Sequence, residues 1–138
     1  MNTIYLAGPI NGCTDRQANA WRDDTTDHFD CIPRFREEIE WLNPMSRDYR
    51  GKEAGSIAEI VTLDKRDVDR SNILVARVLK PSVGTSMEIL YAWERGIPVI
   101  LWVDAGTDTS PWLLYHATTV VLGFDDAMEA IERMLVID

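Results

Sequence analysis

The sequence has 138 residues, a length typical of one domain, and we expect a single domain over residues 1–138. With 14 basic and 23 acidic side chains its formal net charge is −9, which argues against binding to nucleic acid or to an anionic membrane surface. No apolar run approaches the ~18 residues of a membrane-spanning helix, and the first residues show a strand pattern rather than a signal peptide. These features predict a cytoplasmic globular protein.

Apolar runs closed by turn residues predict strands, and helical periodicity predicts helices between them. In chain order we expect a strand at 3–7, a helix from 14 or 15 past 29, a strand at 39–42, a polar loop at 46–55, a helix at 56–70, a strand at 72–76, a helix at 85–96, strands at 99–103 and 118–122, and a helix at 125–136. The helix at 56–70 is expected to bury Ile57, Ile60, Val61, Leu63 and Val68.

Strands and helices alternate along this pattern, which is typical of parallel sheets with crossover helices. The fold class that we predict is therefore α/β, a single-domain doubly wound sandwich of the Rossmann or flavodoxin-like type. Its parallel sheet should contain about five strands. In such folds, ligands bind beyond the carboxyl ends of the strands.

The stretch from Ser82 to Glu88 joins one predicted strand to the next helix and is a candidate binding site. Small residues at Ser82, Gly84 and Ser86 allow a ligand to approach the backbone closely, and a helix start offers free N–H donors. Glu88 is expected in the first turn of that helix. It either points at a ligand there or only complements the helix dipole.

Three acids lie together at the end of the predicted helix 56–70, where negative charge opposes the helix dipole: Asp64, Asp67 and Asp69. We expect one of them to be functional and the other two to be surface or capping groups. Tyr5, in the first predicted strand, would meet Asp64 and Glu88 above the strand ends, although its position also suits the core.

In chain order, the segment Tyr5-Leu6-Ala7-Gly8-Pro9, then Asp64, and then Gly84-Thr85-Ser86-Met87-Glu88-Ile89 resemble motifs of one enzyme family. This is the nucleoside 2-deoxyribosyltransferase family, with its relatives the deoxynucleoside 5′-monophosphate N-glycosidases. The resemblance extends over nearly the whole chain, including the segments 14–17 and 49–51.

The resemblance implies a role for each matching residue. Glu88 would attack the anomeric carbon of 2-deoxyribose, Tyr5 would hydrogen-bond this nucleophile, and Asp64 would donate a proton to the departing base. An ionised Glu88, favoured by helix N–H donors, and an Asp64 with a raised pKa would suit this chemistry. The resemblance also implies a homo-oligomer with a shared active site, acting on a small nucleoside or nucleotide.

Substrate contacts follow from the same resemblance. Those that we expect are Gly8, Asn11, Asp48, Ser82, Gly84 and Ser110. Ser82 and Ser110 match the branch that acts on 5′-monophosphates, where the second serine comes from a neighbouring subunit. The arginine of that branch is replaced by Asn11, so Arg47 or Arg50 would have to supply the missing charge. Asp48 replaces a transferase glutamine and suits an amino-bearing base edge.

The sequence leaves three functions open. The first is transfer of a deoxyribosyl group to another base, the second is hydrolysis of a deoxynucleoside 5′-monophosphate, and the third is a nucleotide-binding module without catalysis. His116 either reaches a neighbour's site or is structural, and Trp112 is the tryptophan best suited to an interface or to base stacking.

Neither a metal nor a cofactor is expected from the sequence. Cys13 and Cys31 are too few for a disulfide framework and have no metal-like spacing with His28 or His116. No phosphate-binding lysine motif or complete dinucleotide fingerprint follows the first strand.

Overall fold

The protein is described by a computed structural model, in which residues 1–135 are placed. Within them, five strands form one parallel sheet. The strands are β1 (Asn2–Ala7), β2 (Ile39–Leu42), β3 (Ile73–Arg77), β4 (Val99–Val103) and β5 (Thr119–Leu122). Their order is β2-β1-β3-β4-β5, and the predicted α/β doubly wound fold with five strands is confirmed.

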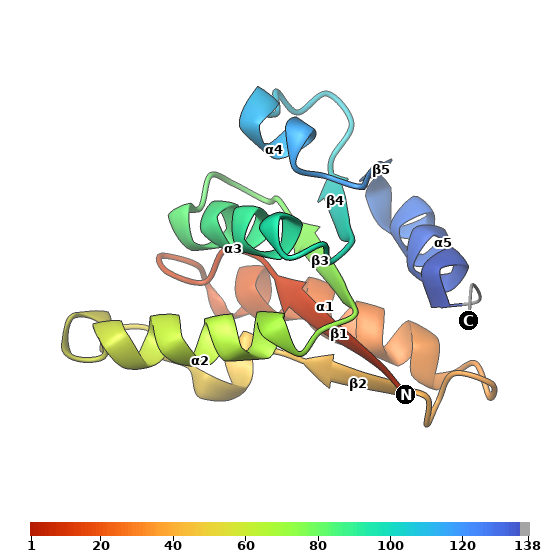
Figure 1. The fold of residues 1–138 in the computed structure, drawn as a ribbon, viewed down its shortest axis with the longest axis horizontal. Coiled ribbons are helices and arrows are strands. Elements are labelled where there is room, and N and C mark those ends of the chain that lie inside the picture. Colours follow the sequence, from red (N-terminus) through yellow and green to blue (C-terminus); the bar gives the residue numbers. More distant parts are fainter. Residues whose placement is uncertain (136–138) are drawn as a thin grey trace.

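Helices connect these strands and cover both faces of the sheet (Figure 1). They are α1 (Asp15–Asp30), α2 (Ile57–Asp69), α3 (Val83–Glu94), α4 (Pro111–Tyr115) and α5 (Gly123–Leu135), with short 3-10 turns at Pro44–Arg47 and Glu53–Gly55. All four predicted helices are present. The helix α4 and the two 3-10 turns were not predicted, and Val136, placed in the last predicted helix, lies outside the described residues.

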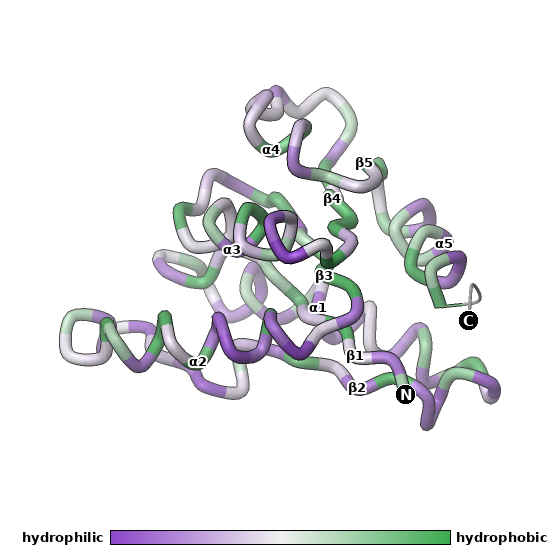
Figure 2. Tube along the Cα trace, in the orientation of Figure 1, coloured by the Kyte–Doolittle hydropathy of each residue, from purple (hydrophilic) through white to green (hydrophobic). Residues whose placement is uncertain are grey.

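The sheet separates two apolar cores because successive side chains of a strand point to opposite faces. In β1, Ile4 and Leu6 pack with α1 and α5, whereas Tyr5 and Ala7 pack on the side of α2 and α3. The central strands β3 and β4 are buried on both faces and form the hydrophobic centre of Figure 2. Tyr5 therefore faces the layer that carries Asp64 and Glu88.

Local sequence signals explain where the two helices nearest the candidate site begin. At α1, Thr14 accepts a hydrogen bond from the backbone of Gln17, whose side chain bonds back to Thr14, forming a capping box. At α3, the hydroxyl of Ser82 accepts a hydrogen bond from the backbone N–H of Thr85 at 3.2 Å. The helix α3 consequently begins at Val83, two residues before the predicted start.

The predicted buried side of α2 is only partly correct. Val68 is fully buried, and Ile60 and Leu63 are partly buried, but Ile57 and Val61 are 67% and 47% exposed. The helix extends beyond the carboxyl ends of the strands at its N-terminal end, so that its first turns have little of the protein to pack against (Figure 1).

Candidate active site

The candidate site lies where the strand order reverses. β1 and β3 are neighbours in the sheet. From β1 the chain crosses to β2 at one edge, whereas from β3 it crosses to β4 in the opposite direction, so that the loops that follow β1 and β3 diverge. In doubly wound sheets this is where ligands bind, outside the carboxyl ends of the strands. The loop after β1 contains Gly8 and Asn11, and the loop after β3 ends at Ser82.

Tyr5 and Glu88 are in direct contact at this point. The phenol of Tyr5 donates a hydrogen bond to Oε2 of Glu88. Tyr5 is fully buried in β1, while Glu88 is half-buried, with protein atoms around its carboxyl group and part of the residue open to solvent. Burial, followed by the nearby charge of Glu88 and Asp64, raises the pKa of Tyr5 well above its usual value. Tyr5 is thus a neutral donor that orients the carboxyl group.

Asp64 lies close enough to this pair for its charge to affect both groups. It is half-buried in α2, and burial raises its pKa, although Arg47 opposes this effect. Nη2 of Arg47 lies 3.2 Å from Oδ1 of Asp64 and 2.8 Å from Oδ2 of Asp67. Asp67 is therefore buried in an ion pair and is not the surface or capping group that was expected, whereas Asp69 accepts a hydrogen bond from the hydroxyl of Tyr91 at 2.9 Å.

The protonation state expected for Glu88 is not the one that this structure favours. Because α3 begins at Val83, Glu88 lies in its second turn, beyond the free N–H groups of the helix start. Burial, together with the charge of Asp64, raises the pKa of Glu88 to about 8, and the hydrogen bond from Tyr5 and the charge of Arg22 only partly offset this. The surroundings of the carboxyl group therefore favour its protonated form over the ionised form expected from the sequence.

Arg22 is a buried charged residue beside the candidate site that the sequence analysis did not single out. It is fully buried in α1 and donates hydrogen bonds to the carbonyl oxygens of Leu6, Gly8 and Ala18. The signal was present in the sequence, because Arg22 follows Ala18 by four residues and Trp21 by one. It therefore lies on the apolar face of its helix, where a charged side chain needs a specific reason.

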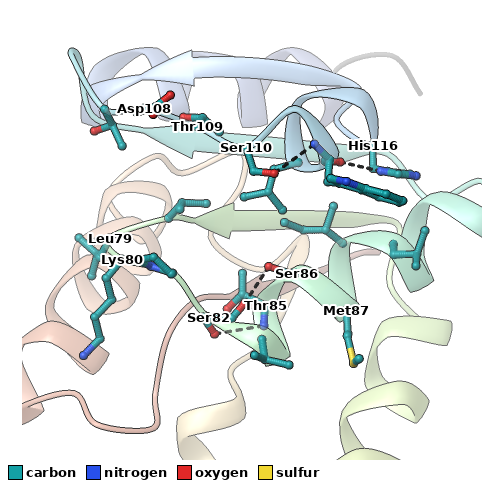
Figure 3. Close-up of a pocket in the computed structure, with 18 residues that line it drawn as sticks. Leu79, Lys80, Ser82, Thr85, Ser86, Met87, Asp108, Thr109, Ser110 and His116 are labelled. Carbon is teal, nitrogen blue, oxygen red and sulfur yellow. Dashed lines mark hydrogen bonds between the residues drawn. The ribbon is translucent and has the colours of Figure 1, made fainter.

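Two predicted serines meet in a cavity of about 780 Å³ between α3 and α4. Figure 3 shows Ser82 and Thr85 on one side of it and Ser110 and His116 on the other. Both serine hydroxyls cap helices, since Ser110 accepts a hydrogen bond from the backbone of Trp112 at 3.2 Å. Tyr5, Asp64 and Glu88 do not line this cavity, so the predicted residues form two groups on different sides of α3.

The remaining predicted contacts lie around these groups. Gly8 packs so tightly against α1 that an added Cβ would lie 2.6 Å from Cζ2 of Trp21, so that glycine is needed for this close approach. A Cβ at Gly84 would meet nothing within 4 Å, which leaves room for a ligand. Asn11 is exposed on its loop.

Arg47 and Arg50 could replace the phosphate-binding arginine that is Asn11 in this sequence. Neither of them is free in this structure, because both form ion pairs. Arg47 is paired as described above, and Nη2 of Arg50 lies 2.7 Å from Asp48 and 2.6 Å from Asp15. Its Nη1 also donates to the carbonyl of Cys13 at 3.1 Å. Arg50 thus ties the loop of Asp48 to the loop after β1. The pKa of Asp48 is lowered to about 2 by the hydrogen bonds from Arg50.

His116 and Trp112 have different environments. His116 is buried, and its Nδ1 donates to the carbonyl of Trp112 at 2.6 Å, as expected of a structural histidine. The Trp112 side chain is 74% exposed and stacks on His116 with an interplanar angle of 13°. Trp112 is therefore available for contact with another molecule.

Among residues 1–135, no group of three or more His, Cys, Asp or Glu side chains is arranged to hold a metal ion. No helix in the same part of the chain is both long enough and apolar enough to cross a membrane.

No protein-family model matches the sequence, and no protein of curated function matches it. Solved structures do match its fold. A 2-deoxyribosyltransferase from Bacillus psychrosaccharolyticus aligns with 91% of this chain and 90% of its own, at a TM-score of 0.71 and 16% identity. The chain has the fold of that enzyme.

Two further structures share the fold. A conserved protein from Enterococcus faecalis aligns with 96% of this chain and 98% of its own, at a TM-score of 0.73 and 19% identity. The CMP N-glycosidase BcmB from Clostridium botulinum aligns over 95% and 99%, at a TM-score of 0.63 and 13% identity. These similarities concern the fold, and they support the resemblance to the nucleoside 2-deoxyribosyltransferase family found in the sequence motifs.

Proposed function

We propose that this protein is an enzyme that cleaves the N-glycosidic bond of a 2′-deoxynucleoside, or of its 5′-monophosphate, and transfers the deoxyribosyl group to another base. The observation that carries this proposal is the contact between Tyr5 and Glu88, with Asp64 beside it at the carboxyl ends of the strands. A carboxyl group oriented by a phenol and accompanied by a second acid suits a reaction with an oxocarbenium-like transition state. The fold shared with a 2-deoxyribosyltransferase and a CMP N-glycosidase supports this assignment.

In the proposed first step, an oxygen of ionised Glu88 attacks C1′ of the sugar. A bond forms between C1′ and Glu88, the bond between C1′ and the base nitrogen breaks, and its electron pair remains with the base. Asp64, whose pKa is raised by burial, gives its proton to the base as it departs. The product is a glycosyl ester of Glu88.

In the second step, a nitrogen of another base attacks C1′ and displaces the carboxylate of Glu88. Its proton passes to Asp64, which restores both acids to their starting state. If water attacks instead, the result is hydrolysis. The two reactions share one intermediate, and the choice between them depends on whether a second base binds and excludes water.

The cavity beside α3 favours the 5′-monophosphate as a second candidate substrate, with net hydrolysis as its reaction. Ser82 and Ser110 line this cavity together with Lys80, whose Nζ donates to the carbonyl of Gly12 at 3.0 Å. A phosphate there would receive hydroxyl donors and one cation, although Arg47 and Arg50 are occupied elsewhere. We include Gly8, Gly84, Asn11 and Asp48 in the proposed binding site, the last two on loops that Arg50 ties together.

We also propose that the protein forms a homo-oligomer through α3 and α4. Large apolar side chains are exposed on these two helices, among them Val83, Met87, Trp93, Trp112 and Tyr115. An apolar surface of this kind marks an interaction site, and a second copy would cover the cavity that Ser82 and Ser110 line. A shared active site would follow from that arrangement.

The test is to incubate the protein with a panel of deoxynucleosides and their 5′-monophosphates, with and without a second free base, and to follow the products by chromatography. Exchange that requires the second base supports a transferase, whereas base and deoxyribose 5-phosphate from monophosphates alone support a hydrolase. Glu88→Gln should abolish turnover, and Glu94→Gln, an exposed change in the same helix, should not. Binding of a nucleotide that survives prolonged incubation with the parent protein would instead favour a binding module.

A further inference from the structure

Arg22 is a buried cation that forms no ion pair with any carboxylate of residues 1–135. The residue has no exposed surface, and the ion pairs found among residues 1–135 do not include it. Removing a guanidinium from water without an ion pair is costly, and an apolar side chain would fill the same space at lower cost. The presence of this charge in the core therefore needs an explanation beyond packing.

The guanidinium uses its donors to hold the carboxyl end of β1. Its Nε and Nη2 each donate to the carbonyl oxygen of Leu6 at 3.2 Å, and Nη2 also donates to the carbonyl of Gly8 at 3.2 Å. Its Nη1 donates to the carbonyl of Ala18, one turn earlier in α1. Arg22 thus connects α1 to the point where β1 becomes a loop, next to Tyr5.

The carbonyl of Leu6 needs such a donor because its neighbouring strand stops there. Ile4 is paired with Trp41 in the parallel ladder between β1 and β2. Continued by two residues, that ladder would place the carbonyl of Leu6 opposite the nitrogen of Pro44, which carries no hydrogen. Arg22 supplies the missing hydrogen bonds, so β1 keeps its strand geometry up to the candidate site.

The charge of Arg22 also acts on the groups of the site. Glu88 is faced by the phenol of Tyr5 from β1, by the carboxyl of Asp64 from α2 and by the positive charge of Arg22 from α1. Burial and Asp64 raise the pKa of Glu88, whereas Tyr5 and Arg22 lower it. Arg47 forms ion pairs with Asp64 and Asp67. Of the groups that affect the pKa of Glu88, Arg22 is therefore the one that carries a positive charge.

We propose that Arg22 is a positioning residue of the active site, which fixes the end of β1 under Tyr5 and provides a positive charge that faces Glu88. This inference rests on the proposed function for its kinetic consequences, but the ionisation of Glu88 can be measured without turnover. An amide in place of the guanidinium would keep a donor for Leu6 and remove the charge. A lysine would keep the charge and lose the forked set of donors.

The test compares Arg22→Gln and Arg22→Lys with the parent protein, with Arg16→Gln in the exposed first turns of α1 as the matched control. The ionisation of Glu88 is followed by NMR of protein labelled at the glutamate carboxyl carbons, with the Glu88 signal assigned from its loss in Glu88→Gln. The pH profile of kcat/KM is recorded for the same variants. Thermal unfolding shows whether each variant is folded.

For Arg22→Gln we expect the titration of Glu88, and the acid limb of kcat/KM, to move upward by about one pH unit, while Arg16→Gln leaves both in place. Arg22→Lys should keep both near the parent values but lower kcat about tenfold, because Leu6 and Gly8 lose donors. An unchanged titration of Glu88 in folded Arg22→Gln would overturn the proposal. If that variant does not fold, Arg22→Lys decides, and a parental kcat in it would overturn the proposal.

The outcome also separates this inference from the proposed function. If the parent protein releases no base from any substrate, the proposed function fails, and the NMR titration still tests the effect of Arg22 on Glu88. If the parent is active but Glu88 titrates at the same pH in all variants, only the role given to Arg22 fails.

Discussion

The phenol of Tyr5 in β1 donates a hydrogen bond to Glu88 in α3, although 83 positions separate the two residues in the sequence. The contact arises because β1 and β3 are neighbours and α3 follows β3 directly. Tyr5 points to the face of the sheet that α3 covers, so the fold itself brings a phenol to a carboxyl group at the strand ends.

We predict that Tyr5→Phe lowers kcat by about ten- to a hundredfold while the protein remains folded. The hydrogen bond from Tyr5 lowers the pKa of Glu88, so its loss should also move the acid limb of the pH profile upward. Tyr91→Phe is the matched control, because Tyr91 hydrogen-bonds Asp69 on the surface at 2.9 Å. Equal activity in the two variants would show that the contact between Tyr5 and Glu88 has no catalytic role.

The raised pKa of Glu88 should appear in the stability of the protein. Its folded pKa of about 8 lies above the ordinary value of 4.5, so between these values the folded state holds a proton that the unfolded state has released. This contribution to the free energy of unfolding is complete below pH 4.5 and is lost as the pH rises to 8. Its size is on the order of a few kcal/mol, and solvent access to part of the residue makes it smaller.

We therefore expect Glu88→Gln to flatten the fall in the free energy of unfolding between pH 5 and pH 8. Urea denaturation of parent and variant at several pH values measures this free energy. Asp64 also has a raised pKa and contributes in the same direction, but it is unchanged in this variant. The same pH dependence in parent and variant would mean that Glu88 is already ionised at pH 5.

Asp64→Asn should distinguish proton donation from a structural role. We expect the variant to lose about a hundredfold or more in activity on ordinary deoxynucleosides, whose base must be protonated as it leaves. It should retain most of its activity on 7-methyl-2′-deoxyguanosine, whose base is already cationic. Asp69→Asn, in the same helix and exposed, is the control. Equal losses on both substrates would exclude Asp64 as the acid.

The proposed homo-oligomer predicts that a charge on the exposed face of α3 dissociates it. Met87 is 67% exposed, and Met87→Glu should give a monomer by light scattering after size exclusion, with reduced activity on monophosphates. Val120→Glu on β5, where the parent residue is 43% exposed, should leave the assembly intact. A parent protein that is already monomeric at micromolar concentration would contradict the proposal.

The strands and long helices were predictable because their signals are local. Apolar runs ending at Gly8-Pro9 and at Asn43-Pro44 gave the limits of β1 and β2, and Thr14 marked the start of α1. The short helix α4 was not predicted, because its five residues are too few for helical periodicity.

The candidate site was less predictable, because its properties depend on contacts between distant segments. The sequence placed Tyr5, Asp64 and Glu88 at the strand ends, but the pKa of Glu88 follows from burial that only the packed structure defines. The ion pairs of Arg47 and Arg50 could not be predicted for the same reason, since their carboxylate partners lie up to 35 positions away. Arg22 was overlooked because a basic residue on a helix is ordinarily exposed.

The most direct test of the proposed mechanism is to trap the covalent intermediate. The protein is incubated with a 2′-fluoro-2′-deoxyarabinosyl nucleoside, whose fluorine slows the second step, and is then analysed by intact mass and by peptide mapping. We predict an added sugar on the peptide that contains Glu88, with release of one base per site, and no adduct in Glu88→Gln. Base release from ordinary substrates by Glu88→Gln at the parental rate, with no adduct on the parent protein, would contradict the assignment of Glu88 as the nucleophile.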